Sequence, residues 1–252
     1  MQLSDAIGLR AGEMVSLIGA GGKTSCLFRL AAESRQAGRR VLVTTTTKIL
    51  KPARPHVDRL FLVQEPQALL ARARQISPPQ IIGAGYGVDE EGKLIGLPAK
   101  WVDEYRASGI FDQLLVEADG AASRLFKVPS EIEPVVPATC DLTVWVMSVK
   151  VLGKPLRPEW VHRAERALSL LGLQRDVPVT REVILRLVRD PNGCLKGIPG
   201  SSRKVALLNQ ADSAEEIENA REVARDLIRA GITRVVITSF AGGEPVKASI
   251  AP

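Results

Sequence analysis

Aromatic residues are scarce in this chain: phenylalanine, tryptophan and tyrosine together make up 4% of its 252 residues. Proteins that bind single-stranded nucleic acid stack bases on aromatic side chains, and this sequence offers little material for such platforms. The chain is basic, with a net charge of +6 and a pI of about 9.4. Its basic residues are nevertheless dispersed in short pairs such as Arg39-Arg40, without a run of five or six. We therefore expect no nucleic-acid partner, although a basic balance is compatible with phosphate-bearing ligands.

Cysteine is scarce as well. Cys26, Cys140 and Cys194 are far apart and odd in number, and none belongs to a C-x-x-C pair. The sequence therefore predicts neither a disulfide framework nor a structural zinc site, which fits a reducing compartment. No apolar run approaches the roughly twenty residues that span a membrane. The N-terminus lacks the basic start and apolar core of a signal peptide, so we expect a cytoplasmic protein without a membrane partner.

Strand-like apolar runs alternate with helical stretches along the chain. Strands are predicted at residues 14–19, 39–47, 58–63, 111–120, 142–149, 203–212 and 233–240. Helices are predicted at residues 24–36, from Pro66 onward, at residues 158–171, and after Ser213, where Ser213 and Glu216 form a capping pattern. This alternation predicts one α/β domain over residues 1–252, with a mostly parallel sheet that helices cover on both faces.

One segment departs from the alternation. In "PQIIGAGYGVDEEGKLIGL", two strand-like runs flank the polar residues Asp89 to Gly92. This pattern is typical of two antiparallel strands joined by a turn. It predicts a β-hairpin insertion over about residues 78–98.

The segment "VSLIGAGGKTSCLFRLA" carries the clearest functional pattern. A phosphate-binding loop requires a buried strand, a tight glycine turn, and a helix whose first N–H groups point at the anion. The usual pattern, G-x-x-x-x-G-K-[ST], is shortened here, because Leu17 stands where the first glycine would be. We expect Lys23 to reach the terminal phosphates and Thr24 to place its hydroxyl on Mg²⁺. The predicted nucleotide-binding residues of this loop are Gly19, Ala20, Gly21, Gly22, Lys23, Thr24 and Ser25.

A run of four threonines follows the second predicted strand, in "VLVTTTTKIL". Their hydroxyls could bind Mg²⁺, hold a water molecule or contact phosphate, and Thr46 is the candidate for positioning a nucleophile. The alternative is that β-branched threonines simply suit the end of a strand.

Two carboxylates end another buried strand, in "QLLVEADGAASRLFKVP". Side chains alternate along a strand, so Glu117 and Asp119 share a face. A carboxylate at this place suits a Mg²⁺ site opposite a phosphate loop. We expect Glu117 to bind the metal together with Thr24, and Asp119 to orient the nucleophile. Arg124 and Lys127 could neutralise phosphate charge; the alternative is a solvated acidic turn.

Two later motifs add candidates. In "VHRAE", His162 could accept a proton or contact a substrate, and Arg163 could stabilise developing phosphoryl charge. "LLNQAD" resembles the N-K-x-D motif with which GTPases read guanine, with Gln210 in place of lysine. Asp212 could accept hydrogen bonds from guanine and Asn209 could brace the loop, although such residues after a strand often only form a turn. ATP and GTP both remain candidate ligands.

These motifs, in this order, resemble the YqeC family, described as accessory proteins of selenium-dependent hydroxylases. The stretches that carry the resemblance are "GAGGKTS", "VLVTTTTKI", "LLVEADGAASRLFKVP", "LGKPL" with "VHRAE", and "LLNQAD". The shortened loop also looks like that of the Mur ligases, where it binds ATP, and Glu117 looks like the Mg²⁺-binding glutamate of dethiobiotin synthetase. Ser123 departs from the glycine- or lysine-rich stretch expected at its place. The resemblance implies a cytosolic P-loop protein associated with maturation of selenium-dependent molybdenum hydroxylases, and it favours functional roles for His162 and Arg163.

Three functions follow as hypotheses. The first is an enzyme that binds Mg²⁺ with ATP or GTP and hydrolyses the nucleotide or transfers its phosphate. The second is a non-enzymatic module that nucleotide controls, such as a chaperone for a hydroxylase or its cofactor. The third, a basic nucleic-acid-binding protein, would require steep salt-dependent binding without any effect of nucleotide.

Overall fold

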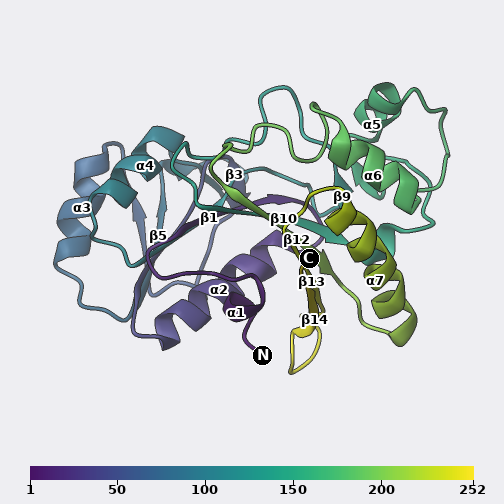
Figure 1. Ribbon diagram of the computed structural model, residues 1–252. Coiled ribbons are helices and arrows are strands. Elements are labelled where there is room, and N and C mark those ends of the chain that lie inside the picture. The colour runs from purple at the N-terminus through teal and green to yellow at the C-terminus, as the bar shows by residue number, and fades with distance from the viewer.

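The computed structural model describes residues 1–252, and a nine-stranded sheet forms its centre (Figure 1). Its strands are β1 (Met14–Gly19), β2 (Arg40–Thr45), β4 (Arg59–Leu62), β5 (Gln80–Gly85), β8 (Gln113–Glu117), β10 (Leu142–Ser148), β12 (Arg203–Asn209), β13 (Arg234–Thr238) and β14 (Val246–Ile250). They lie in the order β14-β13-β12-β10-β1-β8-β2-β5-β4. Only the pair β13–β14 is antiparallel, so the prediction of a mostly parallel sheet is confirmed.

Helices cover both faces of the sheet. They are α1 (Leu3–Ala6), α2 (Lys23–Gln36), α3 (Pro66–Arg74), α4 (Ala99–Ala107), α5 (Ala164–Leu171), α6 (Arg181–Arg189) and α7 (Ala214–Arg229). Helices α1 and α2 pack on one face; α3 and α4 cover one half of the other face, and α5, α6 and α7 cover its second half (Figure 1). Strand residues alternate between these cores: Val144 and Val146 face α2, whereas Trp145 faces the α5–α7 side. The α/β fold with helices on both faces is thereby confirmed.

The central strands are buried on both sides. Every residue of β1, β8 and β10 is buried. Burial on both faces explains why these strands read as continuous apolar runs rather than as alternating patterns. Because the strands are parallel, their carboxyl ends meet at one edge, where ligands bind in open α/β sheets.

The predicted hairpin is shorter in the structure than residues 78–98. Its strands are β6 (Gly87–Val88) and β7 (Lys93–Ile95), which join β3 (Lys48–Leu50) in a small antiparallel sheet. The first strand-like run, β5, belongs to the main sheet instead, where it pairs with β2 and β4. The runs that form β5 and β7 look alike in sequence because both are apolar. They differ in the strands with which they pair.

The predicted helix at residues 158–171 is wrong over its first six residues. Val161–His162 forms a short strand, β11, that pairs with β9 (Phe126–Lys127). Arg163 then adopts a left-handed conformation with φ of 61°, and α5 begins only at Ala164. Pairing with the distant β9 overrides a helical spacing that looked continuous from Val161 to Leu171.

The predicted start of α7 is confirmed. Ser213 accepts a hydrogen bond from the Glu216 backbone N–H, and the Glu216 carboxylate accepts one from the Ser213 backbone N–H, so the capping box is complete. Of the seven helices, none combines the length and apolarity needed to cross a membrane.

Candidate functional site

The glycine turn between β1 and α2 is pressed against neighbouring elements. A Cβ added at Gly19 would lie 2.2 Å from the Val146 carbonyl oxygen, and one at Gly22 would lie 2.1 Å from Asn209 Nδ2. Gly22 also has a φ of 131°, which residues with side chains rarely adopt. The turn therefore requires glycine for its backbone conformation and for its close approach to β10 and β12. It leaves the first N–H groups of α2 at the carboxyl edge of the sheet, the arrangement that binds anions.

Lys23 is buried beside two carboxylates. Its Nζ donates to the Gly19 carbonyl at 2.6 Å and lies 3.0 Å from Asp119 Oδ1 and 3.6 Å from Glu117 Oε1. Only 4% of Lys23 is exposed. The two carboxylates therefore neutralise the Lys23 amine. A phosphate bound to the loop would compete with them for this amine.

Glu117 and Thr24 meet at the end of β8, as the metal hypothesis requires. The Thr24 hydroxyl donates to Glu117 Oε2 at 3.2 Å. Burial raises the pKa of Glu117, and the neighbouring Lys23 opposes this shift. The structure holds no cluster of three or more His, Cys, Asp or Glu side chains that could bind a metal on their own. A hydroxyl and a carboxylate still fit Mg²⁺, which usually takes one or two protein ligands and completes its shell with phosphates and water.

Asp119 lies beneath the loop rather than in the open cavity. Its Oδ2 accepts a hydrogen bond from the Gly19 N–H at 3.0 Å. The same oxygen lies 3.1 Å from Lys127 Nζ, and Asp119 is only 2% exposed. The carboxylate thus holds the start of the glycine turn and pairs with both lysines.

Lys127 continues this pairing away from the loop. Its amine is fully buried, donates to the Gly120 carbonyl, and lies 2.9 Å from Glu133 Oε2. Burial lowers the pKa of Lys127, which the Asp119 and Glu133 carboxylates oppose. Glu133 Oε2 in turn lies 2.7 Å from Arg163 Nη1. A chain of alternating charges therefore connects the phosphate loop with the segment that bears His162.

His162 and Arg163 both line the cavity above the loop. Burial, together with the charges of Arg163 and Lys127, lowers the pKa of His162 to about 4. The imidazole is therefore neutral at physiological pH and can accept a proton or a hydrogen bond. Arg163 has a left-handed backbone, and its guanidinium pairs with Glu133, which lines the same cavity.

The threonines of the run 44–47 differ in their contacts and in whether they line the cavity. Thr46 donates its hydroxyl to the Val135 carbonyl at 2.7 Å and is absent from the cavity lining. Thr45 donates its hydroxyl to the Glu117 backbone carbonyl at 2.8 Å. This bond connects β2 with the residue that is the candidate metal ligand. Thr47 lines the cavity, as does Lys48 after it. The structure therefore places Thr47, rather than Thr46, beside the open space.

Asn209 contacts the loop, whereas the Asp212 side chain is held by residues outside it. Asn209 donates from Nδ2 to the Gly21 carbonyl at 2.8 Å and accepts from the Thr238 hydroxyl at 3.0 Å, so it braces the glycine turn. Asp212 is already engaged: Lys150 Nζ lies 2.7 Å from one carboxylate oxygen, and Ser239 donates to the other at 2.6 Å. Gln210, between them, lines the cavity.

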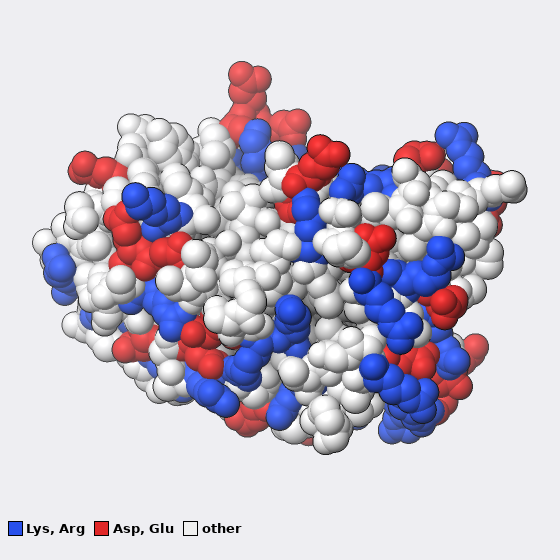
Figure 2. All heavy atoms as spheres, turned by 45° about the horizontal axis from the view of Figure 1, so that its top comes forward, with Lys and Arg blue, Asp and Glu red and all other residues white.

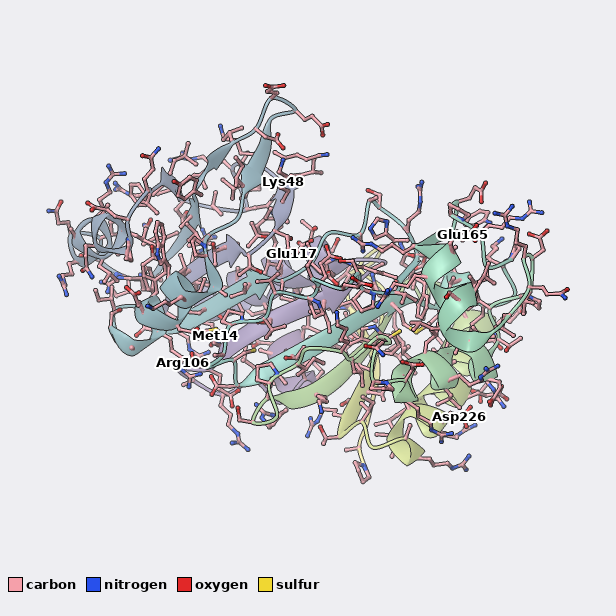
Figure 3. The ribbon with its side chains drawn as sticks, turned by 90° about the horizontal axis from the view of Figure 1, so that it is seen from above. Met14, Lys48, Arg106, Glu117, Glu165 and Asp226 are labelled. Atoms are coloured by element: carbon pink, nitrogen blue, oxygen red, sulfur yellow. The ribbon has the colours of Figure 1, made fainter.

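A cavity of about 1080 Å³ opens above the loop. It lies between the small β3-β7-β6 sheet and the part of the molecule that carries α5, and charges of both signs surround this hollow in Figure 2. Figure 3 shows Glu117 at the end of the sheet, with Lys48 above it in this view and Glu165 of α5 to its right. Charged lining residues that the sequence motifs did not single out are Lys48, Asp89, Glu91, Lys93 and Glu133. Three of them belong to the hairpin, and only its position in space brings them to the site.

Comparison with known proteins shows which family this chain belongs to and which proteins it resembles. The family described as "YqeC protein" matches residues 15–165. An uncharacterised YqeC protein of Escherichia coli (strain K12) is 33% identical over 214 residues, which cover 85% of this chain and 82% of that protein. Among solved structures, the MinD cell division protein of Aquifex aeolicus is similar at 13% identity and a TM-score of 0.41, over 89% of this chain and 82% of that one. The family match covers the glycine loop, both carboxylates and the His162–Arg163 pair. This chain belongs to the YqeC family.

Proposed function

We propose that this protein binds a nucleoside triphosphate, ATP or GTP, together with Mg²⁺ on the loop of residues 19–25. It acts on the terminal phosphate, by hydrolysis or by transfer, as an accessory protein in the maturation of selenium-dependent molybdenum hydroxylases. One observation carries the chemistry: Lys23, Thr24 and Glu117 converge beside a glycine turn at the carboxyl ends of β1 and β8. Membership of the YqeC family supports nucleotide binding, and the maturation role rests on the resemblance of the motifs to that family.

The loop supplies the groups that bind phosphate. The N–H groups at the start of α2 point at the anion, and the helix dipole favours negative charge there. Lys23 leaves Asp119 and reaches the terminal phosphates, which offer a stronger anionic partner than a carboxylate already shared with Lys127. Thr24 and Glu117 hold Mg²⁺, which neutralises phosphate charge when it is bound.

The opposite wall supplies the remaining roles. Arg163 faces the cavity and stabilises negative charge that develops on the phosphoryl oxygens. His162, neutral at physiological pH, accepts a proton from the attacking nucleophile. Asp119 acts in this proposal as a positioning residue rather than as the group that orients the nucleophile, because it holds the Gly19 N–H and both lysines from below the loop.

A second candidate function is a nucleotide-controlled binding module without turnover of its own. The charge chain from Lys23 through Asp119, Lys127 and Glu133 to Arg163 favours it, because it ties the phosphate loop to a distant segment. If a bound nucleotide draws Lys23 away from Asp119, the loss of that positive charge changes the electrostatic energy of the pairs Asp119–Lys127, Lys127–Glu133 and Glu133–Arg163. Measured turnover tests the module: release of phosphate from the bound nucleotide over hours excludes it, because a module without turnover releases none.

The metal assignment is tested with Glu117→Gln, which keeps the shape and the acceptor for Thr24 but removes the charge. We expect Mg²⁺ to strengthen nucleotide binding in the wild type and to have little effect in the variant, as measured by calorimetry with and without Mg²⁺. Glu91→Gln is the matched control, since Glu91 also lines the cavity but pairs with Lys93 at its rim. Equal Mg²⁺ dependence in wild type and Glu117→Gln would show that Glu117 does not bind the metal.

A further inference from the structure

The cavity is wider than the phosphate loop alone requires. Its lining includes Gln210 after β12, the glycine turn after β1, Glu117 at the end of β8 and Thr47 after β2. These strands span four strand intervals in the sheet order, or roughly 19 Å at about 4.8 Å per interval. A volume of about 1080 Å³ lies just above the range of about 300 to 1,000 Å³ for sites that hold one drug-sized ligand. The space therefore accommodates a second molecule beside a nucleotide.

The lining also shows the chemistry of that molecule. Only 5 of the 23 lining residues are hydrophobic, so the cavity suits a polar ligand rather than an apolar one. Most of its cations are already neutralised: Lys48 pairs with Asp89, and Lys93 pairs with Glu91. Arg124 is different. Its backbone N–H donates to the Ala121 carbonyl, but its guanidinium forms no ion pair and no hydrogen bond with the protein.

Local backbone structure brings Arg124 to the same wall as His162 and Arg163. Arg124 follows two residues in the left-handed region, Ala122 with a φ of 46° and Ser123 with a φ of 56°. Such conformations are uncommon outside glycine and concentrate at functional sites. The next residue, Leu125, donates its N–H to the Trp160 carbonyl at 3.0 Å, and β9 then pairs with β11. Sequence positions almost forty apart are thereby joined in one surface.

This wall has unused donors for an anion. A guanidinium carries five N–H donors in a fixed fork that matches carboxylate and phosphate oxygens. Arg124 uses none of its five, and Arg163 contacts only Glu133. The nucleotide's own phosphates already have Lys23, the α2 N-terminus and the metal ligands, so Arg124 remains for another anionic group, and Arg163 serves both that group and the transferring phosphoryl group.

We propose that Arg124, Arg163 and His162 form a subsite for a second substrate, a small polar molecule with an anionic group, beside the terminal phosphate of the nucleotide. This rests on the proposed function and favours transfer over hydrolysis. An oxygen nucleophile of the second substrate forms a new bond to the terminal phosphorus, and the bond from that phosphorus to the bridging oxygen breaks. The electron pair leaves on the nucleoside diphosphate, and the proton of the nucleophile goes to the His162 imidazole.

The test uses the full chain with the nucleotide site filled. Wild-type protein is saturated with Mg²⁺ and a non-hydrolysable imido analogue of ATP or GTP, and inorganic phosphate and acetate are then titrated in parallel by calorimetry. We expect one anion to bind beside the analogue, and the preferred probe distinguishes a phosphate-bearing from a carboxylate-bearing substrate. Arg124→Gln should weaken this binding by roughly tenfold to a hundredfold, as expected for lost hydrogen bonds to a charged group, while the affinity for the analogue is kept.

Arg74→Gln is the matched control, because Arg74 is exposed at the end of α3 and makes no ion pair. It should leave both affinities unchanged. Absence of anion binding to the saturated wild type would overturn the subsite. So would an Arg124→Gln variant that loses affinity for the analogue itself, since Arg124 would then serve the nucleotide. Failure of the analogue to bind at all would refute the proposed function directly, and the inference with it.

Discussion

At the residue scale, the site is a set of buried and half-buried charges that neutralise one another. A buried charge without a partner costs several kcal/mol, so each cation lies against at least one carboxylate. Loss of one member would leave its partners uncompensated. The three cations are Lys23, Lys127 and Arg163, and the three carboxylates are Glu117, Asp119 and Glu133.

Only part of this set could be predicted from the sequence. Lys23, Glu117 and Asp119 stand at the ends of apolar runs, and parallel strands bring such ends together. Glu133 lies in a loop without periodicity, so no local pattern indicates that it pairs with Lys127. The same holds for Thr46, whose partner is the distant Val135 carbonyl.

His162 provides a prediction at this scale. Burial and the charges of Arg163 and Lys127 lower the pKa of His162 to about 4, against which Glu133 and Asp119 act only in part. Nuclear magnetic resonance titration of the imidazole should therefore give a midpoint near pH 4. Arg163→Gln should raise the midpoint, because one repelling charge is gone, whereas Arg74→Gln should not.

The sign of the effect on stability follows from linkage. Between the folded pKa of about 4 and an unfolded value of about 6.5, the unfolded chain binds more protons at His162 than the folded one. The contribution of His162 to stability is therefore complete above about pH 6.5 and is lost as the pH falls toward 4. A titration midpoint near 6.5 in the wild type would contradict the conclusion that burial and the charges of Arg163 and Lys127 disfavour the protonated imidazole.

At the element scale, the glycine turn joins three strands into one site. It follows β1, lies against the Val146 carbonyl of β10, and is braced by Asn209 at the end of β12. The sequence indicated the turn, because strand, glycines, Lys-Thr and helix follow one another. It did not indicate β11, because Val161 fits the spacing of α5 and only its pairing with Phe126 makes it a strand residue.

Gly22→Ala tests the packing of this turn. The new Cβ would meet Asn209 Nδ2 at 2.1 Å and would hold a φ of 131°, so we expect a loss of roughly 2 kcal/mol or more in the free energy of unfolding. Gly38→Ala is the matched control, because Gly38 also has a positive φ, of 83°, but open space around it. Urea denaturation measures both variants.

A double variant separates the clash from the backbone strain. Asn209→Ala removes the atom that the new Cβ would meet, so Gly22→Ala should cost less in that background than in the wild type. Equal costs in the two backgrounds, or a Gly22→Ala variant as stable as Gly38→Ala, would show that the turn is not pressed against Asn209.

At the scale of the whole molecule, the order of the strands decides which residues meet. β1 lies between β8 and β10, so the glycine turn has the carboxylates of β8 on one side and Asn209, beyond β10, on the other. The alternation of strands and helices predicted the parallel sheet and the edge where its site lies. The strand order and the position of the hairpin over the cavity depend on contacts between distant segments, which a single sequence does not display.

Phosphate binding by the glycine turn is tested by calorimetric titration of ATP and GTP, with and without Mg²⁺, into wild type, Lys23→Ala and Lys93→Ala. Lys93 lines the same cavity but lies at its exposed rim, so it controls for a general loss of positive charge. We predict that the wild type and Lys93→Ala bind one nucleotide, more tightly with Mg²⁺, and that Lys23→Ala does not. A wild type that binds neither nucleotide, or a Lys23→Ala variant that binds as tightly as wild type, would contradict a phosphate-binding role for the glycine turn.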